Sequence, residues 1–259
     1  MSESVAHTKT IVFIHGMFMN PVSWHDWIDV FTARGYTCHA PAYPFHAGEP
    51  SWLRQNIDSA LGALTFDETL ASLRDYIVAL PEAPILIGHS MGGLMVQKLI
   101  SMDVGAAGVC IDSAPPAGVF SLEWSFLRAN LPTVNPLKGN SPCLASVEWF
   151  HYAFCHTMSL AQTREAYDRF VVPESRNLPR SSTKSRQKID FARAHRPLLM
   201  IAGELDHIIP ASLNRKNVDA YRDADSRRDF KVFEGRTHYI CSQSGWEDVA
   251  SYVAEWIGA

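Results

Sequence analysis

The sequence lacks the features of three classes of protein. Its apolar runs are far shorter than the roughly 20 residues needed to cross a membrane, so no membrane span is expected. Its 23 Lys and Arg residues against 27 Asp and Glu give a formal net charge of -4. That balance provides no basic field for nucleic acid. Because no basic stretch followed by an apolar stretch opens the chain, no secretory signal is expected.

Cysteine is sparse and widely spaced. The five cysteines form no C-x-x-C pair; they are Cys38, Cys110, Cys143, Cys155 and Cys241. An odd, scattered set predicts free thiols in a reduced, cytoplasmic protein. A disulfide between Cys143 and Cys155 stays open, because both lie in one region. His151 and His156 flank Cys155, but this spacing matches no zinc pattern, so no metal is predicted.

Apolar residues, in contrast, are plentiful enough for a large buried core. They make up 47% of 259 residues, which suits a single globular enzyme domain. Buried-strand runs alternate with segments of helical periodicity, and strands are expected at 10–14, 36–40, 85–87, 109–111, 197–202 and 230–233. Helices are expected at 21–34, with Asn20 as its cap, at 65–80, after residue 90 and at 246–257. This alternation predicts a mostly parallel sheet flanked by helices.

The most informative motif is the G-x-S-x-G pattern around Ser90. An apolar strand, 85–87, runs into Gly88 and the motif, and helical spacing follows. Small neighbours let the backbone turn sharply there. Such a turn exposes a serine hydroxyl and directs the first amides of the helix toward whatever the serine attacks. The pattern therefore predicts a nucleophile elbow.

A serine needs a base to remove its proton, and the base needs an orienting group. Asp206 follows the buried strand 197–202, in a loop at the carboxyl edge of the expected sheet. His238 follows the short strand 230–233 and precedes the last helix. The order serine, aspartate, histidine suggests Ser90 as nucleophile, His238 as base and Asp206 as acid.

With these motifs in the same order, the chain resembles the α/β-hydrolases. The resemblance implies an α/β-hydrolase fold and the catalytic roles just named. The segment from Val12 to Met17 resembles the early strand of that family, which ends in His-Gly-x. By that resemblance the backbone amides of Met17 and Met91 form the oxyanion hole. His15 is expected to steady this loop.

Two assignments have competitors. Asp112 also follows a strand, 109–111, and some members of the family carry their acid there. Asp206 is favoured because its Gly-Glu-Leu-Asp…Pro setting matches the usual acid loop. If Asp112 is not the acid, it is expected to cap the turn at Ser113. His207 is less suited as the base, because it adjoins Asp206 in sequence and adjacent loop residues seldom face each other. His89 is less suited because it is not expected to approach the serine oxygen freely.

Residues 118–194 interrupt the pattern of strands and helices. Prolines and apolar helical pieces fill this segment, and the family resemblance implies a cap of three or four short helices over the nucleophile. Residues 1–117 and 195–259 would then form the hydrolase core. The basic run Arg176–Lys188 is expected to be a solvated return loop, with binding of an anionic group as an alternative.

The predicted substrate is a medium-sized, mostly apolar ester or lactone, cleaved as in serine carboxylesterases without any cofactor. Substrate contacts are expected from His15, Phe18, Trp149 and Phe150. Two alternatives stay open. The same catalytic residues serve hydroxynitrile lyases and cofactor-free dioxygenases of this fold, and some relatives are small-molecule receptors without hydrolytic activity.

Overall fold

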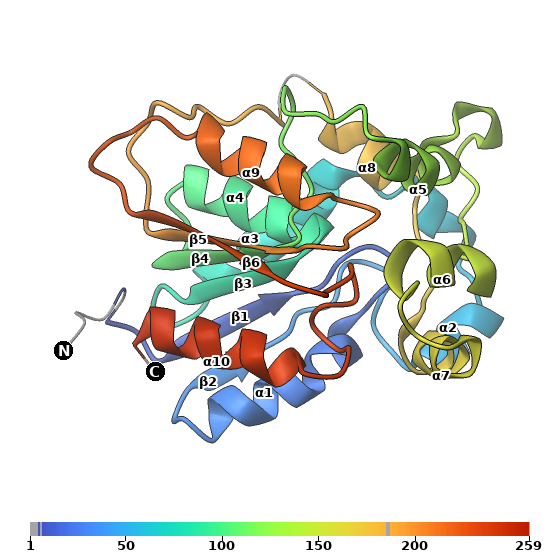
Figure 1. The fold of residues 1–259 in the computed structure, drawn as a ribbon, viewed down its shortest axis with the longest axis horizontal. Coiled ribbons are helices and arrows are strands. Elements are labelled where there is room, and N and C mark those ends of the chain that lie inside the picture. The colour runs from blue at the N-terminus through green and yellow to red at the C-terminus, as the bar shows by residue number, and fades with distance from the viewer. Residues whose placement is uncertain (1–4, 6, 185–186, 259) are drawn as a thin grey trace.

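The computed structural model describes residues 5, 7–184 and 187–258. Within them, six parallel strands form one sheet in the order β2-β1-β3-β4-β5-β6 (Figure 1). The strands are β1 (Thr10–Ile14), β2 (Thr37–His39), β3 (Ile85–His89), β4 (Ala107–Ile111), β5 (Leu198–Gly203) and β6 (Arg228–Phe233). This sheet confirms the predicted α/β class.

Five helices cover the two faces of the sheet. One face carries α3 (Phe66–Val78), α4 (Met91–Ser101) and α9 (Ala211–Ala220), and the other carries α1 (His25–Thr32) and α10 (Trp246–Ile257) (Figure 1). Successive strand residues point to opposite faces. In β1, Val12 therefore packs in the core beneath α3 and α4, whereas Phe13 packs with Trp27 of α1. Two apolar cores thus hold the sheet from both sides.

Local signals account for several helix starts. Asn20 accepts a hydrogen bond from the Val22 amide at 3.1 Å, as its capping position predicts. The predicted helix 21–34 is, however, divided into a short 3₁₀ helix, Pro21–Trp24, and α1. Thr65 and Glu68 form the expected capping box at the start of α3. The helix α2 (Pro50–Gln55) was not predicted.

The regular secondary structure of the segment between β4 and β5 is helical. Its described residues form α5 (Trp124–Val134), α6 (Val147–Phe154), α7 (Leu160–Phe170) and α8 (Asn177–Ser182). They add no strand to the sheet, and they gather at one end of it, beyond the carboxyl ends of the strands (Figure 1). A third apolar core, which includes Phe154 and Tyr167, lies among these helices and against Phe18.

The expectation of a solvated loop over Arg176–Lys188 was wrong for its first half. Residues 177–182 form α8, and Leu178 is fully buried beside α3. The Arg180 guanidinium donates to the Gly139 carbonyl oxygen at 2.7 Å, so this arginine links two parts of the segment. A charge-based reading missed the apolar side of this short helix. Residues 185–186 of the run lie outside the described residues.

Two further features bear on the sequence-based expectations. All five cysteines are free thiols, so no disulfide joins Cys143 to Cys155. Within the part of the chain that the structure describes, no helix has both the length and the apolar character required to cross a membrane.

Candidate active site

Ser90 lies at the sharp turn between β3 and α4. Its backbone has φ 57° and ψ −118°, a conformation that residues other than glycine rarely adopt. A nucleophile elbow requires such a strained turn. Close packing leaves no room for larger neighbours. A Cβ on Gly92 would lie 2.1 Å from the Ile14 carbonyl oxygen, and a Cβ on Gly16 would lie 2.9 Å from the Ser90 Cβ. The glycines therefore allow the end of β1 to touch the elbow.

His238 and Asp206 form a buried hydrogen-bonded pair. The His238 Nδ1 lies 2.6 Å from the Asp206 Oδ2, and both side chains are fully buried. The other carboxyl oxygen of Asp206 accepts from the amides of Ile208 and Ile209, at 2.7 and 2.9 Å. Because Nδ1 faces a carboxyl oxygen, it carries the proton of the neutral imidazole and leaves Nε2 as the acceptor. Burial lowers the pKa of His238 to about 3, so the ring is neutral near pH 7.

The bond between Ser90 and His238 is not formed in this structure. Nε2 of His238 is buried and has no hydrogen-bond partner among the described residues. Bonds of this kind are often long in the free protein and tighten when substrate is in place. The three residues that the sequence predicts as a triad therefore sit on neighbouring loops, with one of the two connecting bonds present.

Asp112 is buried directly behind this pair. It follows β4 with φ 43°, and its Oδ1 accepts from the Gly203 amide at 2.6 Å. It does not cap the turn at Ser113, whose amide donates to Asn214 instead. Burial, together with the nearby charge of Asp206, raises the pKa of Asp112 well above its usual value, and its Oδ2 has no hydrogen-bond partner among the described residues. Two carboxyls sharing a dry site cannot both ionise, so Asp112 is the neutral member.

One group of side chains has the composition of a metal site. His89, Asp112 and His238 each place one ligand atom within 4.8 Å of the others. However, the Nε2 of His89 lies 2.9 Å from the His238 carbonyl oxygen, and a ring nitrogen facing a carbonyl is protonated. The His89 and His238 rings also pack against each other, with centroids 4.7 Å apart. Each histidine keeps one unprotonated ring nitrogen, Nδ1 of His89 and Nε2 of His238, so these hydrogen bonds leave open whether the group takes a proton or a metal ion.

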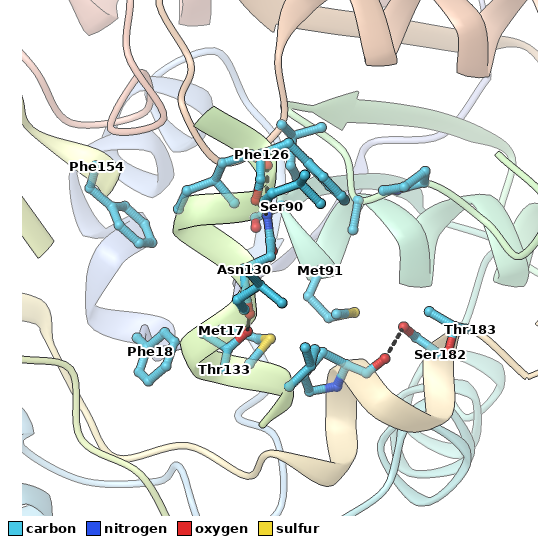
Figure 2. A pocket seen from close by; sticks show the side chains of 18 of the residues that line it. Met17, Phe18, Ser90, Met91, Phe126, Asn130, Thr133, Phe154, Ser182 and Thr183 are labelled. Atoms are coloured by element: carbon cyan, nitrogen blue, oxygen red, sulfur yellow. Dashed lines mark hydrogen bonds between the residues drawn. The ribbon is translucent and has the colours of Figure 1, made fainter. Parts of the chain in front are cut away.

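Two residues that line the cavity beside Ser90 have backbone amides without a hydrogen-bond partner in the described chain. Met17 follows Gly16 in the loop after β1, and Met91 is the first residue of α4; both line the same cavity as Ser90 (Figure 2). Neither amide donates to another group of the described chain. The Met91 amide also lies at the positive end of the α4 dipole. Both amides are thus free to bind an oxygen that carries negative charge.

The cavity itself has a volume of about 230 Å³ and mostly apolar walls. Phe18 and Trp149 line it, as the sequence predicts, with their ring centroids 5.2 Å apart (Figure 2). His15 and Phe150 do not line it. His15 is buried beneath the loop, where its Nε2 accepts from the Tyr43 amide, and Phe150 is buried behind Phe154.

The sequence analysis missed the contribution of α5 and α8 to this cavity. Phe126, Asn130 and Thr133 lie on one face of α5 and line it, as do Ser182 and Thr183 at the end of α8 (Figure 2). The spacing of the three α5 residues is helical and could have marked a shared face. No local pattern in the sequence indicated that this face, rather than the opposite one, meets Ser90.

The model of the alpha/beta hydrolase family matches residues 11–252 of the chain. The chain belongs to this family. Similar solved structures include a monoacylglycerol lipase from Paleococcus ferrophilus, with 19% identity, a TM-score of 0.69, and 97% of this chain and 95% of that chain covered. A pyrethroid hydrolase from Sphingobium faniae shares 18% identity, with a TM-score of 0.67 and coverage of 97% and 98%. A methylketone synthase I from tomato shares 15% identity, with a TM-score of 0.70 and coverage of 96% and 97%. No curated protein matches the chain.

In this alpha/beta hydrolase, we expect His89 to make the free energy of unfolding decrease as the pH falls below about 6.5. Burial and the nearby His238 lower the pKa of His89 well below 6.5 in the folded state. Its contribution to stability is therefore complete above pH 6.5 and is lost as the pH falls below it. We expect His89→Asn to flatten the acid-side decline by up to about 1.4 kcal/mol per pH unit. Urea denaturation from pH 5 to 8 measures this slope.

His46 provides a control of opposite sign. Burial acts to lower the pKa of His46, but the Glu174 carboxylate outweighs it and the pKa is raised. Its contribution is present below pH 6.5 and is lost as the pH rises through the folded-state value. His46→Asn should therefore change the slope only above pH 6.5.

Equal slopes for His89→Asn and the native chain below pH 6.5 would show that His89 is not held neutral.

Proposed function

We propose that this protein is a serine hydrolase that cleaves carboxylic esters, lactones among them, through an acyl-enzyme. The observation that carries the proposal is the buried His238–Asp206 pair, at 2.6 Å. Its imidazole packs against His89, which directly precedes a serine held at φ 57° on the cavity wall. Strained backbone of this kind costs free energy, and it concentrates at functional sites. The lipase and the pyrethroid hydrolase among the similar structures share this fold and are consistent with the proposal.

In the first half of the proposed reaction, the Ser90 Oγ attacks the ester carbonyl carbon. His238 Nε2, the unprotonated nitrogen, takes the hydroxyl proton, and Asp206 stabilises the resulting imidazolium through Nδ1. The carbonyl oxygen gains negative charge and accepts hydrogen bonds from the amides of Met17 and Met91. His238 then gives its proton to the departing alcohol, and an acyl-Ser90 ester remains.

In the second half, water releases the acid. His238 Nε2 removes a proton from the water as it attacks the acyl carbon, and the same two amides hold the oxyanion. The proton then returns to the Ser90 oxygen as the bond to the acyl group breaks. Asp112, neutral and bound to the Gly203 amide, takes no proton in this scheme; it borders the Asp206 carboxylate.

The substrate class follows from the cavity. Its walls are mostly aliphatic and aromatic, so an acyl or alcohol group of mostly apolar character gains most from burial there. We propose that residues 118–194 act as a cap that sets this specificity, and that residues 1–117 and 195–259 form the catalytic core. The cap supplies Phe126, Trp149 and Phe154 to the walls, whereas the reacting groups come from the core.

The first test of the proposed function is Ser90→Ala. We expect hydrolysis of p-nitrophenyl esters to fall by about 10⁴-fold or more, because the nucleophile is lost. Labelling by an organophosphonate, located by peptide mass, should disappear as well. Ser182→Ala is the matched control, since this serine lines the same cavity but lies outside the elbow. A label on another residue, or turnover that survives in Ser90→Ala, would exclude the mechanism; a protein that is never labelled would favour a receptor.

The second test separates the two candidate acids. Asp206→Asn should lower kcat by about 10⁴-fold, because the asparagine amide can hold His238 with the wrong nitrogen protonated. Asp112→Asn should lower kcat about tenfold at most, because its oxygen can still accept from the Gly203 amide. Steady-state kinetics on one ester measure both. Should Asp112→Asn prove the more damaging, the acid lies after β4 and the assignment here is wrong.

The third test concerns two adjacent aromatic residues of α6. Trp149→Ala should shift relative kcat/KM among acetate, butyrate and octanoate esters by about 10- to 200-fold, because Trp149 lines the cavity. Phe150→Ala should instead lower the free energy of unfolding by about 3–5 kcal/mol and leave chain-length preference unchanged, because Phe150 is fully buried. If Trp149→Ala depresses all three esters equally and also lowers the melting temperature, Trp149 only supports the fold.

A further inference from the structure

The loop between β1 and the first helical turn is held by contacts from distant parts of the chain. The hydroxyl of Tyr43 donates to the His15 carbonyl oxygen at 2.5 Å. At Phe18 both backbone groups are engaged: the carbonyl oxygen accepts from the Val172 amide at 3.0 Å, and the amide donates to the Glu174 Oε2 at 3.4 Å. Between these fixed points lies Met17, which lines the cavity and whose amide donates to no other group of the described residues.

Phe18 needs this support because of its backbone conformation. Its φ is 62°, in the left-handed region that bulky residues seldom adopt. Such a conformation persists only where surrounding contacts hold it in place. Residues 172 and 174 grip both sides of the peptide, and the Phe18 ring packs on Trp149. All of these contacts come from the proposed cap.

Glu174 is a fully buried carboxylate surrounded by donors. Its backbone pairs with Cys143 in both directions, at 2.8 and 2.7 Å. Its Oε1 accepts from the Ser175 amide at 2.6 Å, and its Oε2 faces the Phe18 amide and the His46 Nε2, the latter at 3.3 Å. The side chain therefore has one fixed orientation, set by groups on three separate segments.

His46 supplies the opposite charge. Its Nδ1 lies 2.9 Å from the Pro44 carbonyl oxygen, and its Nε2 faces the Glu174 carboxylate. A neutral imidazole can donate from only one nitrogen, so two acceptors require the imidazolium. The raised pKa of His46 agrees with this. Burying such a pair adds little stability compared with apolar side chains of the same size, so a positional role explains it better.

We propose that Glu174 is a positioning residue that, together with His46, holds Phe18 in its left-handed conformation and thereby aims the Met17 amide at the substrate's carbonyl oxygen. The inference deepens the proposed function and rests on it for the identity of that oxygen. An oxyanion donor acts only at hydrogen-bond distance from the charged oxygen, about 2.7–3.1 Å, so a small rotation of the Met17 peptide removes its effect. Seating of the cap and assembly of the oxyanion hole then depend on the same carboxylate.

Two substitutions separate the parts played by Glu174. Glu174→Ala removes both the charge and the acceptor for the Phe18 amide, whereas Glu174→Gln removes the charge and keeps an oxygen acceptor. Asn177→Ala is the matched control, because Asn177 also joins the cap to the core, through the Gly62 carbonyl oxygen, but lies away from the loop. All variants are made in the full chain.

Three measurements are made on each folded variant. Amide hydrogen exchange of peptides that cover Met17 and Phe18 reports how firmly the loop is held. Endpoint labelling with an organophosphonate counts sites with a competent Ser90, so kcat is expressed per labelled site. The KM for a p-nitrophenyl ester is measured alongside, because loss of a donor that acts on the transition state lowers kcat and leaves KM nearly constant.

We expect Glu174→Ala to exchange faster in this peptide and to lose about 10- to 100-fold in kcat per labelled site. This is less than the roughly 100- to 1000-fold for complete loss of an oxyanion donor, because the Met17 amide is displaced and not removed. Glu174→Gln should fall between Ala and the native chain, and Asn177→Ala should match the native chain in both readouts. If Glu174→Ala does not fold, hydrogen exchange and kcat per labelled site of Glu174→Gln test the positioning role.

Unchanged exchange in the folded Glu174 variants would overturn the positioning role. Faster exchange with an unchanged kcat per labelled site would overturn its catalytic consequence. A native protein that carries no label at Ser90 and cleaves no ester contradicts the proposed function instead, and the exchange rates then decide about Glu174 on their own.

Discussion

The close approach of the β1 loop to the elbow is the contact on which the site depends. Gly92 lies against the Ile14 carbonyl oxygen, and Gly16 lies against Ser90, where in each case a Cβ would collide. Because of this contact, Met17 of the β1 loop and Met91 of the next helix line the same cavity. The carboxyl ends of parallel strands meet at one edge of the sheet, so β5 and β6 deliver Asp206 and His238 to the same place.

The polar groups of the site are packed into a dry interior, and this sets their charges. His238 and His89 are kept neutral by burial, while Asp112 is kept neutral by burial and by the charge of Asp206. Only Asp206 of this group accepts from two amides and an imidazole. Burial raises the pKa of Asp206 as well, but the two amide hydrogen bonds act against it, so Asp206 is the carboxyl of this group whose ionised form is best supported.

Much of this arrangement could be predicted from the sequence, and the rest could not, for a physical reason. The elbow at Ser90 and the capping box at Thr65 are local, since neighbouring residues determine their geometry. Trp149 and Phe150 are adjacent and both aromatic, yet helical rotation directs one into the cavity and the other into the cap core. Glu174 and Phe18 are 156 residues apart in the sequence, so no local pattern predicts their contact.

The helices between β4 and β5 occupy a crossover between two adjacent parallel strands, and this has an evolutionary consequence. Insertions, deletions and exchanges in such a crossover leave the register of the sheet untouched, so under the proposed function specificity could diversify while Ser90, Asp206 and His238 stay in place. In this chain the freedom has a limit. Any replacement segment must still bring an acceptor to the Phe18 amide and a counter-charge to His46. Drift within the cap is therefore expected to spare the few positions around residue 174 long after the rest has changed.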